Sequence, residues 1–385
     1  MASSPSRRIA LLVPELPTAE ELAPYLRRID EAHWYTNFGP LVRELEADMA
    51  RRLSEPGLPS QHVVSVSNAT LGLELALLAL KLPPGSRVLM PALTFVASAA
   101  AAMRAGCVPV FCDIEPDTWI LSPRIAREAL RKVRVDVVMP VSTYGCPQDM
   151  KEWDAFSDDT GIPVVVDAAG AFGNQSAGVR CVSVFSLHAT KALAGAEGGF
   201  VCAADPIYAG RVRVLSNFGI EPATDTQRAT GTTGVVHSAG TNGKLSEYHA
   251  AIALAALERW ERTSTRRIDL HRAYIELLAE HCPQFQTQSR APNDVYSILP
   301  VLTPAGCAAI EVCRFLERRG IETRRWYCPP LPVHPAFSAM PVTGPLDVAR
   351  QVGERLLAVP FHLHLTYDDI FSVTKTLGQF RDSLG

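Results

Sequence analysis

The chain has 385 residues, of which 47% are hydrophobic and 20% are charged. This composition is ordinary for a packed globular protein and argues against extensive disorder, while the length allows a large domain with a smaller one beside it. The formal net charge is −3, and no lysine- or arginine-rich run is interleaved with aromatic residues. A nucleic-acid partner is therefore not expected.

Neither the first residues nor the longest apolar stretch predicts an association with membranes. The N-terminal apolar stretch is short and is interrupted at Pro14 and Glu15, so no signal peptide is predicted and a cytosolic location is expected. Residues 95–112 are apolar but are broken by an arginine, a glycine and a proline, which excludes a membrane span. Nine cysteines are scattered without a CxxC pair, so we expect reduced, mostly buried thiols and no metal site.

In chain order, residues 1–40 include Pro14, Pro17, Pro24 and Pro40 and are expected to form an arm rather than part of the core. From residue 41 onward, short runs rich in valine and isoleucine alternate with stretches of helical periodicity. The runs predict buried strands at 62–66, 87–90, 108–111, 136–141, 163–167, 182–186 and 199–203. The intervening stretches 70–81, 95–105 and 123–132 predict helices. This alternation predicts an α/β fold with a mostly parallel seven-stranded sheet, whose ligands bind at the carboxyl ends of the strands.

The second half of the chain begins with residues 221–242, which are rich in threonine, glycine and alanine and predict a long exposed loop. Residues 245–262 return to helical spacing, and the change of domain is expected along this helix or the next. We therefore expect a large domain over residues 41–262 and a smaller α+β domain over residues 263–385.

The most informative stretch follows the sixth predicted strand and reads Phe185-Ser186-Leu187-His188-Ala189-Thr190-Lys191, with Glu197-Gly198-Gly199 after it. A lone lysine is far more often a solvated surface charge than a nucleophile. Here the lysine lies between two strands, with Ser186 five positions before it, so its amine can lie near a cofactor whose phosphate the serine reaches. Burial and a nearby cation lower the pKa of a lysine, as a nucleophilic amine requires.

Three further stretches supply groups that suit a flat, phosphorylated ligand. An apolar strand ends at Asp167, whose carboxylate could hold a protonated ring nitrogen or could cap the next helix. The first strand gives way at Asn68-Ala69-Thr70 to a helix whose free N–H groups suit a phosphate, although such residues cap many helices that bind nothing. Phe95 follows the second strand and could stack on a ring or belong to the core. Neither a Gly-x-Gly-x-x-Gly pattern nor a Walker lysine is present at this helix, which disfavours dinucleotide or ATP binding.

Together and in this order, these stretches resemble the DegT/StrS family of pyridoxal-phosphate (PLP)-dependent sugar aminotransferases, which have the aspartate-aminotransferase fold. The resemblance covers most of the chain. Further matching positions are Asn37-Phe38-Gly39-Pro40, Pro91 to Ala97, Gly106 to Asp113, Tyr144-Gly145, Asp149-Met150, Asn217-Phe218-Gly219, Gly240-Thr241-Asn242, Gly320-Ile321, Arg324, His334 and Pro360.

The resemblance implies roles for the residues already singled out. Lys191 would hold PLP as a Schiff base and move the proton, Asp167 would pair with the pyridinium nitrogen, and Phe95 would stack on the ring. The implied phosphate ligands are Ala69, Thr70, Ser186 and Asn242. In the family, the residue that matches Asn242 reaches the cofactor of the neighbouring subunit, which implies a homodimer with shared active sites.

Substrate contacts are expected from Asn37, His188, Arg325 and His334. For His188 a packing role against its own loop stays open, and for His334 a place in a surface loop stays open.

The chain departs from the family pattern at three places. Asn68-Ala69-Thr70 replaces the usual Ser-Gly-Thr, but it keeps the backbone donors and the hydroxyl. Gly170 stands where the family usually has glutamine or histidine near the ring hydroxyl of the cofactor, which leaves room or a water there. Lys244 stands where an arginine is usual and keeps the charge, but it cannot make the same two-pronged contact.

The implied activity is transfer of an amino group from glutamate to a nucleotide-linked keto-deoxysugar, in two half-reactions through the pyridoxamine form. A keto-cyclitol or another natural-product ketone stays open as acceptor, because Gly170 is unusual. A related sugar dehydratase is disfavoured, because that branch of the family has histidine in place of the Schiff-base lysine. A non-catalytic binding protein that kept the fold is the remaining alternative, and the colour of the purified protein would distinguish it.

Overall fold

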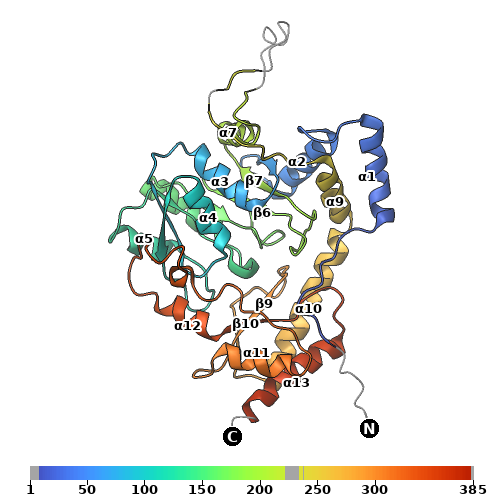
Figure 1. Ribbon diagram of the computed structural model, residues 1–385, viewed down its shortest axis with the longest axis vertical. Coiled ribbons are helices and arrows are strands. Elements are labelled where there is room, and N and C mark those ends of the chain that lie inside the picture. The colour runs from blue at the N-terminus through green and yellow to red at the C-terminus, as the bar shows by residue number, and fades with distance from the viewer. Residues whose placement is uncertain (1–7, 222–233, 237, 383–385) are drawn as a thin grey trace.

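The computed structural model describes residues 8–221, 234–236 and 238–382 (Figure 1). Within them, strands lie at the seven places that the sequence predicts for the large sheet. They are β1 (His62–Val66), β2 (Arg87–Pro91), β3 (Val108–Cys112), β4 (Val137–Val138), β5 (Val165–Asp167), β6 (Val182–Ser186) and β7 (Gly199–Ala203).

Ladders of hydrogen bonds join these strands in two groups, β3-β2-β4 and β1-β7-β6-β5. Two isolated parallel bridges, Val138 to Val164 and Val141 to Asp167, place β4 beside β5 and so connect the groups. Only β7 runs antiparallel to its neighbours, β1 and β6. The other pairs are parallel, so the predicted α/β fold with a mostly parallel sheet is confirmed.

Strands β4 and β5 are shorter than the predicted runs 136–141 and 163–167. The reason is that Pro140 and Pro163 have no N–H group to donate to a ladder. Their carbonyls still accept, from Asp167 N at 2.9 Å and from Val138 N at 3.1 Å, so the two segments stay side by side.

Helices cover both faces of the large sheet, because consecutive strand residues point into two different cores. Val64 packs with α3 (Ala69–Ala79), α4 (Val96–Arg104) and α7 (Pro206–Ser216). Val63 packs on the opposite side with α2 (Pro40–Leu53), α5 (Pro123–Leu130), α6 (Met150–Thr160) and α9 (Glu247–Glu258). Three of these helices, α3, α4 and α5, lie within two residues of their predicted bounds.

The predicted helix 245–262 is two helices, since α9 ends at Glu258 and α10 (Trp260–His281) begins after Arg259. At this break the buried Arg259 forms ion pairs with Glu15 at 3.0 Å and with Glu21 at 2.8 Å. The junction is thereby tied to the segment that leads into α1 (Ala19–Ala32). Figure 1 shows α9 and α10 running nearly end to end along one side of the molecule.

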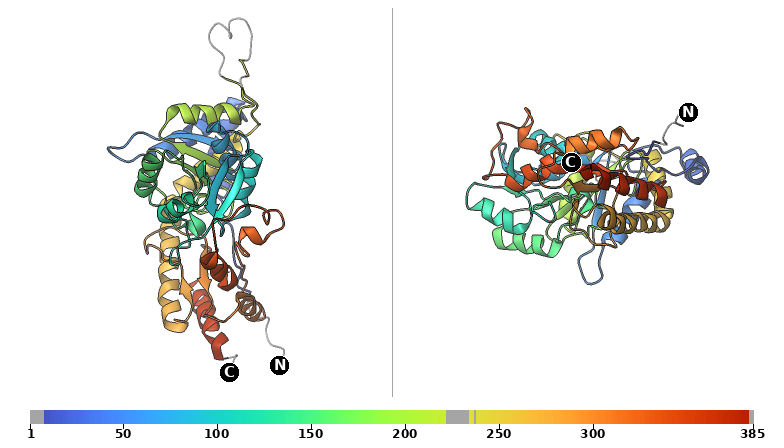
Figure 2. Two further views of the ribbon diagram at one scale, coloured as in Figure 1. Left: turned by 90° about the vertical axis from the view of Figure 1, so that its left-hand side faces the viewer. Right: turned by 90° about the horizontal axis from the view of Figure 1, so that it is seen from below.

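The C-terminal part is the predicted α+β unit. Its antiparallel sheet has the order β10-β9-β8, formed by β8 (Gln286–Thr287), β9 (Leu299–Leu302) and β10 (Leu356–Val359). Around it lie α10, α11 (Ala309–Glu317), α12 (Asp347–Arg355) and α13 (Tyr367–Asp382). In Figure 1 and in the left view of Figure 2, these elements form the lower end of the molecule. The predicted boundaries after residues 40 and 262 stay predictions.

Most of the predicted loop 221–242 lies outside the described residues. All nine cysteines are unpaired and six of them are buried. No helix of the described chain has the length and apolarity needed to cross a membrane.

Candidate active site

A cavity of about 360 Å³ opens at the edge of the large sheet where β1, β2, β4, β5 and β6 all end. Because parallel strands end at the same edge, the segments that follow them converge there. The structure brings together seven of the predicted site residues in the lining, namely Ala69, Thr70, Phe95, Asp167, Ser186, His188 and Lys191.

Asp167 is the last residue of β5 and is only 5% exposed. Its Oδ2 accepts a hydrogen bond from Ser98 Oγ at 2.7 Å, and its Oδ1 accepts one from Ala169 N at 3.2 Å. Burial raises the pKa of this carboxyl group, whereas the bond from Ser98 and the charge of Lys191 lower it. No helix begins between β5 and β6, so the alternative that Asp167 caps a helix is wrong.

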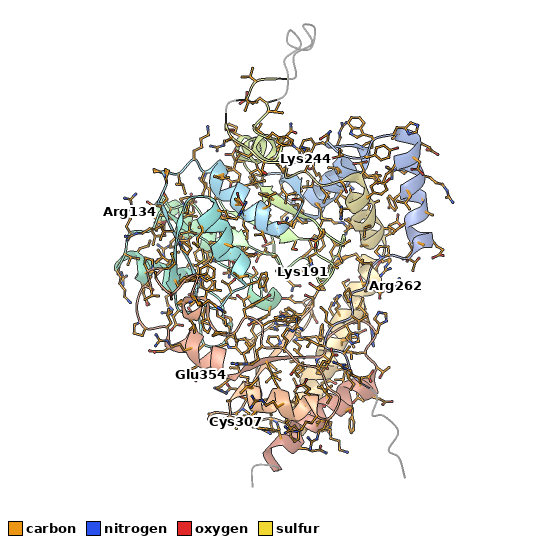
Figure 3. The ribbon with its side chains drawn as sticks, in the orientation of Figure 1. Arg134, Lys191, Lys244, Arg262, Cys307 and Glu354 are labelled. Carbon is orange, nitrogen blue, oxygen red and sulfur yellow. The ribbon has the colours of Figure 1, made fainter. Side chains whose placement is uncertain are left out.

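Lys191 lies in a folded loop between β6 and β7. The loop is closed by hydrogen bonds from Leu187 N to Gly198 O at 2.9 Å and from Ala189 N to Ala196 O at 2.8 Å. Burial lowers the pKa of Lys191, and Asp167 opposes that shift. Burial therefore makes it easier for this amine to lose its proton, as a nucleophile requires, and Figure 3 shows Lys191 near the centre of the molecule.

His188 lines the cavity but is also engaged with its own loop. Its Nδ1 lies 2.9 Å from Thr190 Oγ1, and its Nε2 lies 3.7 Å from Glu197 Oε1. Both ring nitrogens thus have partners in the loop that carries Lys191.

The start of α3 presents free donors to the cavity. Asn68 caps the helix by accepting from Leu71 N at 2.9 Å, while the amides of Ala69 and Thr70 have no partner among the described residues. Nearby, Ser186 Oγ accepts from His188 N and has no acceptor for its own hydrogen in the same part of the chain. Free amides at a helix start, with a hydroxyl beside them, form an anion site.

Gly199 allows α3 to come this close to the sheet. It pairs with Val66 in β1 and with Ser186 in β6, and so lies between them at the strand ends. A Cβ at this position would lie 2.8 Å from Ala69 N and 2.7 Å from Phe185 O, which is too close for any side chain.

The outer wall of the cavity is aromatic. Phe95 is 53% exposed, and its ring lies 5.5 Å from that of Tyr327, which stacks on Tyr144 at 5.1 Å. Trp326 and Leu12 complete this wall. The sequence motifs did not identify Tyr327, Trp326 or Leu12 as site residues, because they lie more than a hundred residues from Lys191 and stand in no local motif of their own.

Four predicted site residues do not line the cavity. Arg325 donates to the carbonyls of Gly353 and Glu354, so its guanidinium points elsewhere. His334 Nε2 lies 3.2 Å from Pro329 O. Asn37 and Asn242 are both exposed on the surface. At Gly170, a Cβ would meet nothing closer than Gly145 N at 3.5 Å, which is an ordinary contact, so close packing does not require glycine there.

A model of the DegT/DnrJ/EryC1/StrS aminotransferase family matches residues 17–378. The chain belongs to this family. It is therefore a PLP-dependent aminotransferase, as the resemblance implied.

Individual relatives cover nearly the whole chain. Protein Rv3402c of Mycobacterium tuberculosis is 31% identical, with 95% of this chain and 88% of that protein covered. The dTDP-4-amino-4,6-dideoxy-D-glucose transaminase of Escherichia coli is 28% identical, with 96% and 98% covered.

Two crystal structures have the same fold. One is of a Bacillus cereus protein assigned as a PLP-dependent aminotransferase, with a TM-score of 0.88, 27% identity, and 97% of this chain and 100% of that chain covered. The other is DesI in the presence of its TDP-sugar product, with a TM-score of 0.83, 30% identity, and 96% and 92% covered.

Proposed function

We propose that the protein transfers an amino group from glutamate to a nucleotide-linked keto-deoxysugar, with PLP bound in the cavity and attached covalently to Lys191. When bound, PLP supplies a ring that withdraws electrons from the substrate carbon at which a proton is removed or added. The chain's own residues bind this ring, orient it and move the proton.

The chemistry of the cavity fits PLP at both of its ends. The unpaired amides of Ala69 and Thr70 and the hydroxyl of Ser186 would bind the phosphate. At the inner end, the carboxylate of Asp167 would hold the ring nitrogen protonated, and Phe95 would cover one face of the ring. These two anchors would place the ring within reach of Lys191.

Lys191 would then move the proton of the reaction. Once its Nζ is released from the cofactor, it would take up and return the proton at the substrate carbon that carries the amino group. The lowered pKa of Lys191 supports this role, because a base must be able to lose its proton near neutral pH.

The charges of the cavity lining carry the substrate assignment. Among the described residues, the charged side chains that line it are Asp167, Lys191 and Glu197, without an arginine. An aminotransferase that accepts only amino and keto acids usually grips the substrate carboxylate with an arginine. An aromatic wall with hydroxyl groups suits a sugar ring better. The substrates in the names of the E. coli transaminase and the DesI structure support the same acceptor class.

The proposed assembly is a homodimer with shared active sites. Asn242 is exposed and does not line the cavity of its own chain, so it is free to bind the cofactor phosphate of a second copy. Lys244 Nζ lies 4.4 Å from the ring centre of Phe218, and Figure 3 shows it well apart from Lys191. In a second copy, Lys244 would supply a cation for the carboxylate of the donor, because Lys191 is engaged with the cofactor.

A mixing experiment tests the shared site. Inactive Lys191→Ala and inactive Asn242→Ala proteins, mixed under conditions of demonstrated subunit exchange, should recover part of the activity. One hybrid site would then carry both native residues. Exchange without any return of activity would contradict the cross-subunit role of Asn242.

The two half-reactions test the acceptor class. Glutamate should convert the lysine-bound cofactor to the pyridoxamine form, with loss of the long-wavelength absorbance. A nucleotide-linked 4-keto- or 3-keto-6-deoxyhexose should restore that absorbance at micromolar concentration. The Lys191→Ala protein is the control and should show neither change. The sugar assignment fails if a free cyclitol ketone, or a keto acid other than the product of the donor, serves at least as well as every sugar nucleotide tried.

A further inference from the structure

Two buried hydroxyl groups lie in a chain behind Asp167. Ser98, in the first turn of α4, lies with its Oγ 2.7 Å from Asp167 Oδ2. Thr94, just before the same helix, lies with its Oγ1 3.0 Å from Ser98 Oγ. The exposed fractions are 0% for Ser98 and 1% for Thr94, so both groups are buried, although Thr94 lies at the cavity lining.

The number of available hydrogens fixes the direction of these bonds. An ionised Asp167 can only accept, so Ser98 must donate its one hydroxyl hydrogen to it. Thr94 must then donate to Ser98 Oγ, and every hydroxyl hydrogen in the chain has an acceptor.

Protonation of Asp167 at Oδ2 would reverse this order. Asp167 would donate to Ser98 and Ser98 to Thr94, whose own hydrogen has no further acceptor among the described residues. A buried donor without an acceptor is costly, so the chain of hydroxyls disfavours a proton on Oδ2, while the bond from Ala169 N disfavours a proton on Oδ1.

The Ser98 hydroxyl does not make the hydrogen bond to its own helix backbone that is usual for a serine. A serine within a helix commonly bonds to the backbone carbonyl four residues earlier. The Ser98 hydroxyl instead joins two side chains, Thr94 and Asp167, that belong to different segments.

We propose that Ser98, supported by Thr94, is a positioning residue that keeps Asp167 ionised and fixes its carboxylate, and thereby sets the protonation of the ring nitrogen of PLP. The inference rests on the proposed role of Asp167. Burial alone raises the pKa of Asp167, and the hydrogen bond from Ser98 is the largest influence that lowers it again.

The pH dependence of PLP binding is the measurement that separates this role from a merely structural one. If binding requires ionised Asp167, the dissociation constant of PLP rises as the pH falls through the pKa of that group. This rise at low pH is the acid limb of the binding curve. A hydrogen bond to a charged group corresponds to a shift of about one to two pH units. In Ser98→Ala this acid limb should therefore move upward by about that amount. At a pH between the two limbs, PLP should bind about 10- to 100-fold more weakly than to the native protein.

Four further variants sharpen the test. Ser98→Thr keeps the hydroxyl and should restore the native limb, whereas Thr94→Val should shift it in the same direction as Ser98→Ala but less. Asp167→Asn should lack the limb, and adding Ser98→Ala to it should change nothing more. The other titratable groups that face Asp167, Lys191 and Tyr327, are unchanged in all of these proteins.

Each outcome supports or overturns the positioning role of Ser98. A native acid limb in Ser98→Ala would overturn the inference, and so would an equal weakening of PLP binding by Ser98→Ala in the Asp167→Asn background. If Ser98→Ala does not fold by circular dichroism, the limb of Thr94→Val decides in its place. If the native protein and Asp167→Asn share one limb, the proposed role of Asp167 itself has failed, which is a different result.

Discussion

The inner and outer parts of the cavity are built in different ways. The inner part consists of residues that directly follow strands of one sheet, such as Thr70 after β1 and Asp167 at the end of β5. The outer part adds Leu12 from the N-terminal segment and Trp326 and Tyr327 from the C-terminal part of the chain. The inner part is therefore fixed by the large sheet alone, whereas the outer part depends on how the C-terminal elements pack against it.

Tyr144 and Arg290 join the two parts. The hydroxyl of Tyr144 donates to Trp326 O and accepts from Tyr327 N. The Arg290 guanidinium donates to the carbonyls of Tyr144 and Ile298, each at 2.9 Å. These bonds set where the aromatic wall lies relative to the sheet. Because the inner part would hold PLP and the outer part would contact the acceptor, changes in the two parts should affect different steps of the reaction.

The largest effect is expected at the inner end. Asp167→Asn should bind PLP more weakly at every pH and, once saturated with PLP, should lose about 100-fold or more in turnover, because the ring nitrogen loses the fixed charge that stabilises its protonated form. Steady-state kinetics on the PLP-saturated protein measure this. Asp205→Asn, which alters a helix cap on α7, is the matched control and should keep its activity. Nearly native turnover in Asp167→Asn would exclude it as the partner of the ring nitrogen.

Gly199→Ala should damage the phosphate end. The new Cβ would push against the Ala69 amide, so PLP should bind about 10- to 100-fold more weakly, in line with the usual cost of overpacking. Equilibrium dialysis against PLP checks this. Gly210→Ala on α7 meets nothing within 4 Å and should leave PLP binding unchanged. Native affinity in Gly199→Ala would mean that the Ala69 amide does not bind the phosphate.

The packing behind Arg290 should respond to acid, because the Arg290 guanidinium lies 4.1 Å from the ring centre of Tyr296. His271 lies on α10 against Tyr296, 2% exposed, and neither ring nitrogen has a partner among the described residues. Burial lowers its pKa to about 4. Since the folded state holds the neutral ring, its contribution is complete above about pH 6.5 and is lost as the pH falls toward 4. At pH 5 the loss should be about 2 kcal/mol in the free energy of unfolding.

His271→Phe keeps the ring against Tyr296 and removes the titration. In urea unfolding, the difference between pH 7 and pH 5 should therefore be about 2 kcal/mol smaller than in the native protein. An equal loss of stability in both proteins would show that His271 is not the group that responds to acid.

The smallest effect is expected from the outer wall itself. Trp326→Ala should raise the KM for the acceptor about 10-fold, because an aromatic surface against the sugar is lost, while the affinity for PLP stays native. Ser186→Ala should do the reverse, with weaker PLP binding and a native acceptor KM. If both variants alter the same constant, the division of the cavity into two functional parts is wrong.

This division also explains how much of the site could be predicted from the sequence. Strand ends at one edge of a parallel sheet must meet, so Lys191, Asp167 and Ala69 could be placed together from short motifs. Tyr327 could not be placed, because its position depends on contacts with Tyr144 across a long separation in the chain. Arg325 was misplaced for the same reason, since its carbonyl partners Gly353 and Glu354 are set by the packing of α12. The lengths of β4 and β5 were overestimated where proline removed a donor.

Identification of the lysine that carries the cofactor tests the central assignment most directly. Borohydride reduction of the PLP-loaded protein, followed by proteolysis and mass spectrometry, should give one phosphopyridoxyl peptide, the one that contains Lys191. The Lys191→Ala protein should give none. A stoichiometric adduct on any other lysine, with Lys191 unmodified, would contradict the assignment.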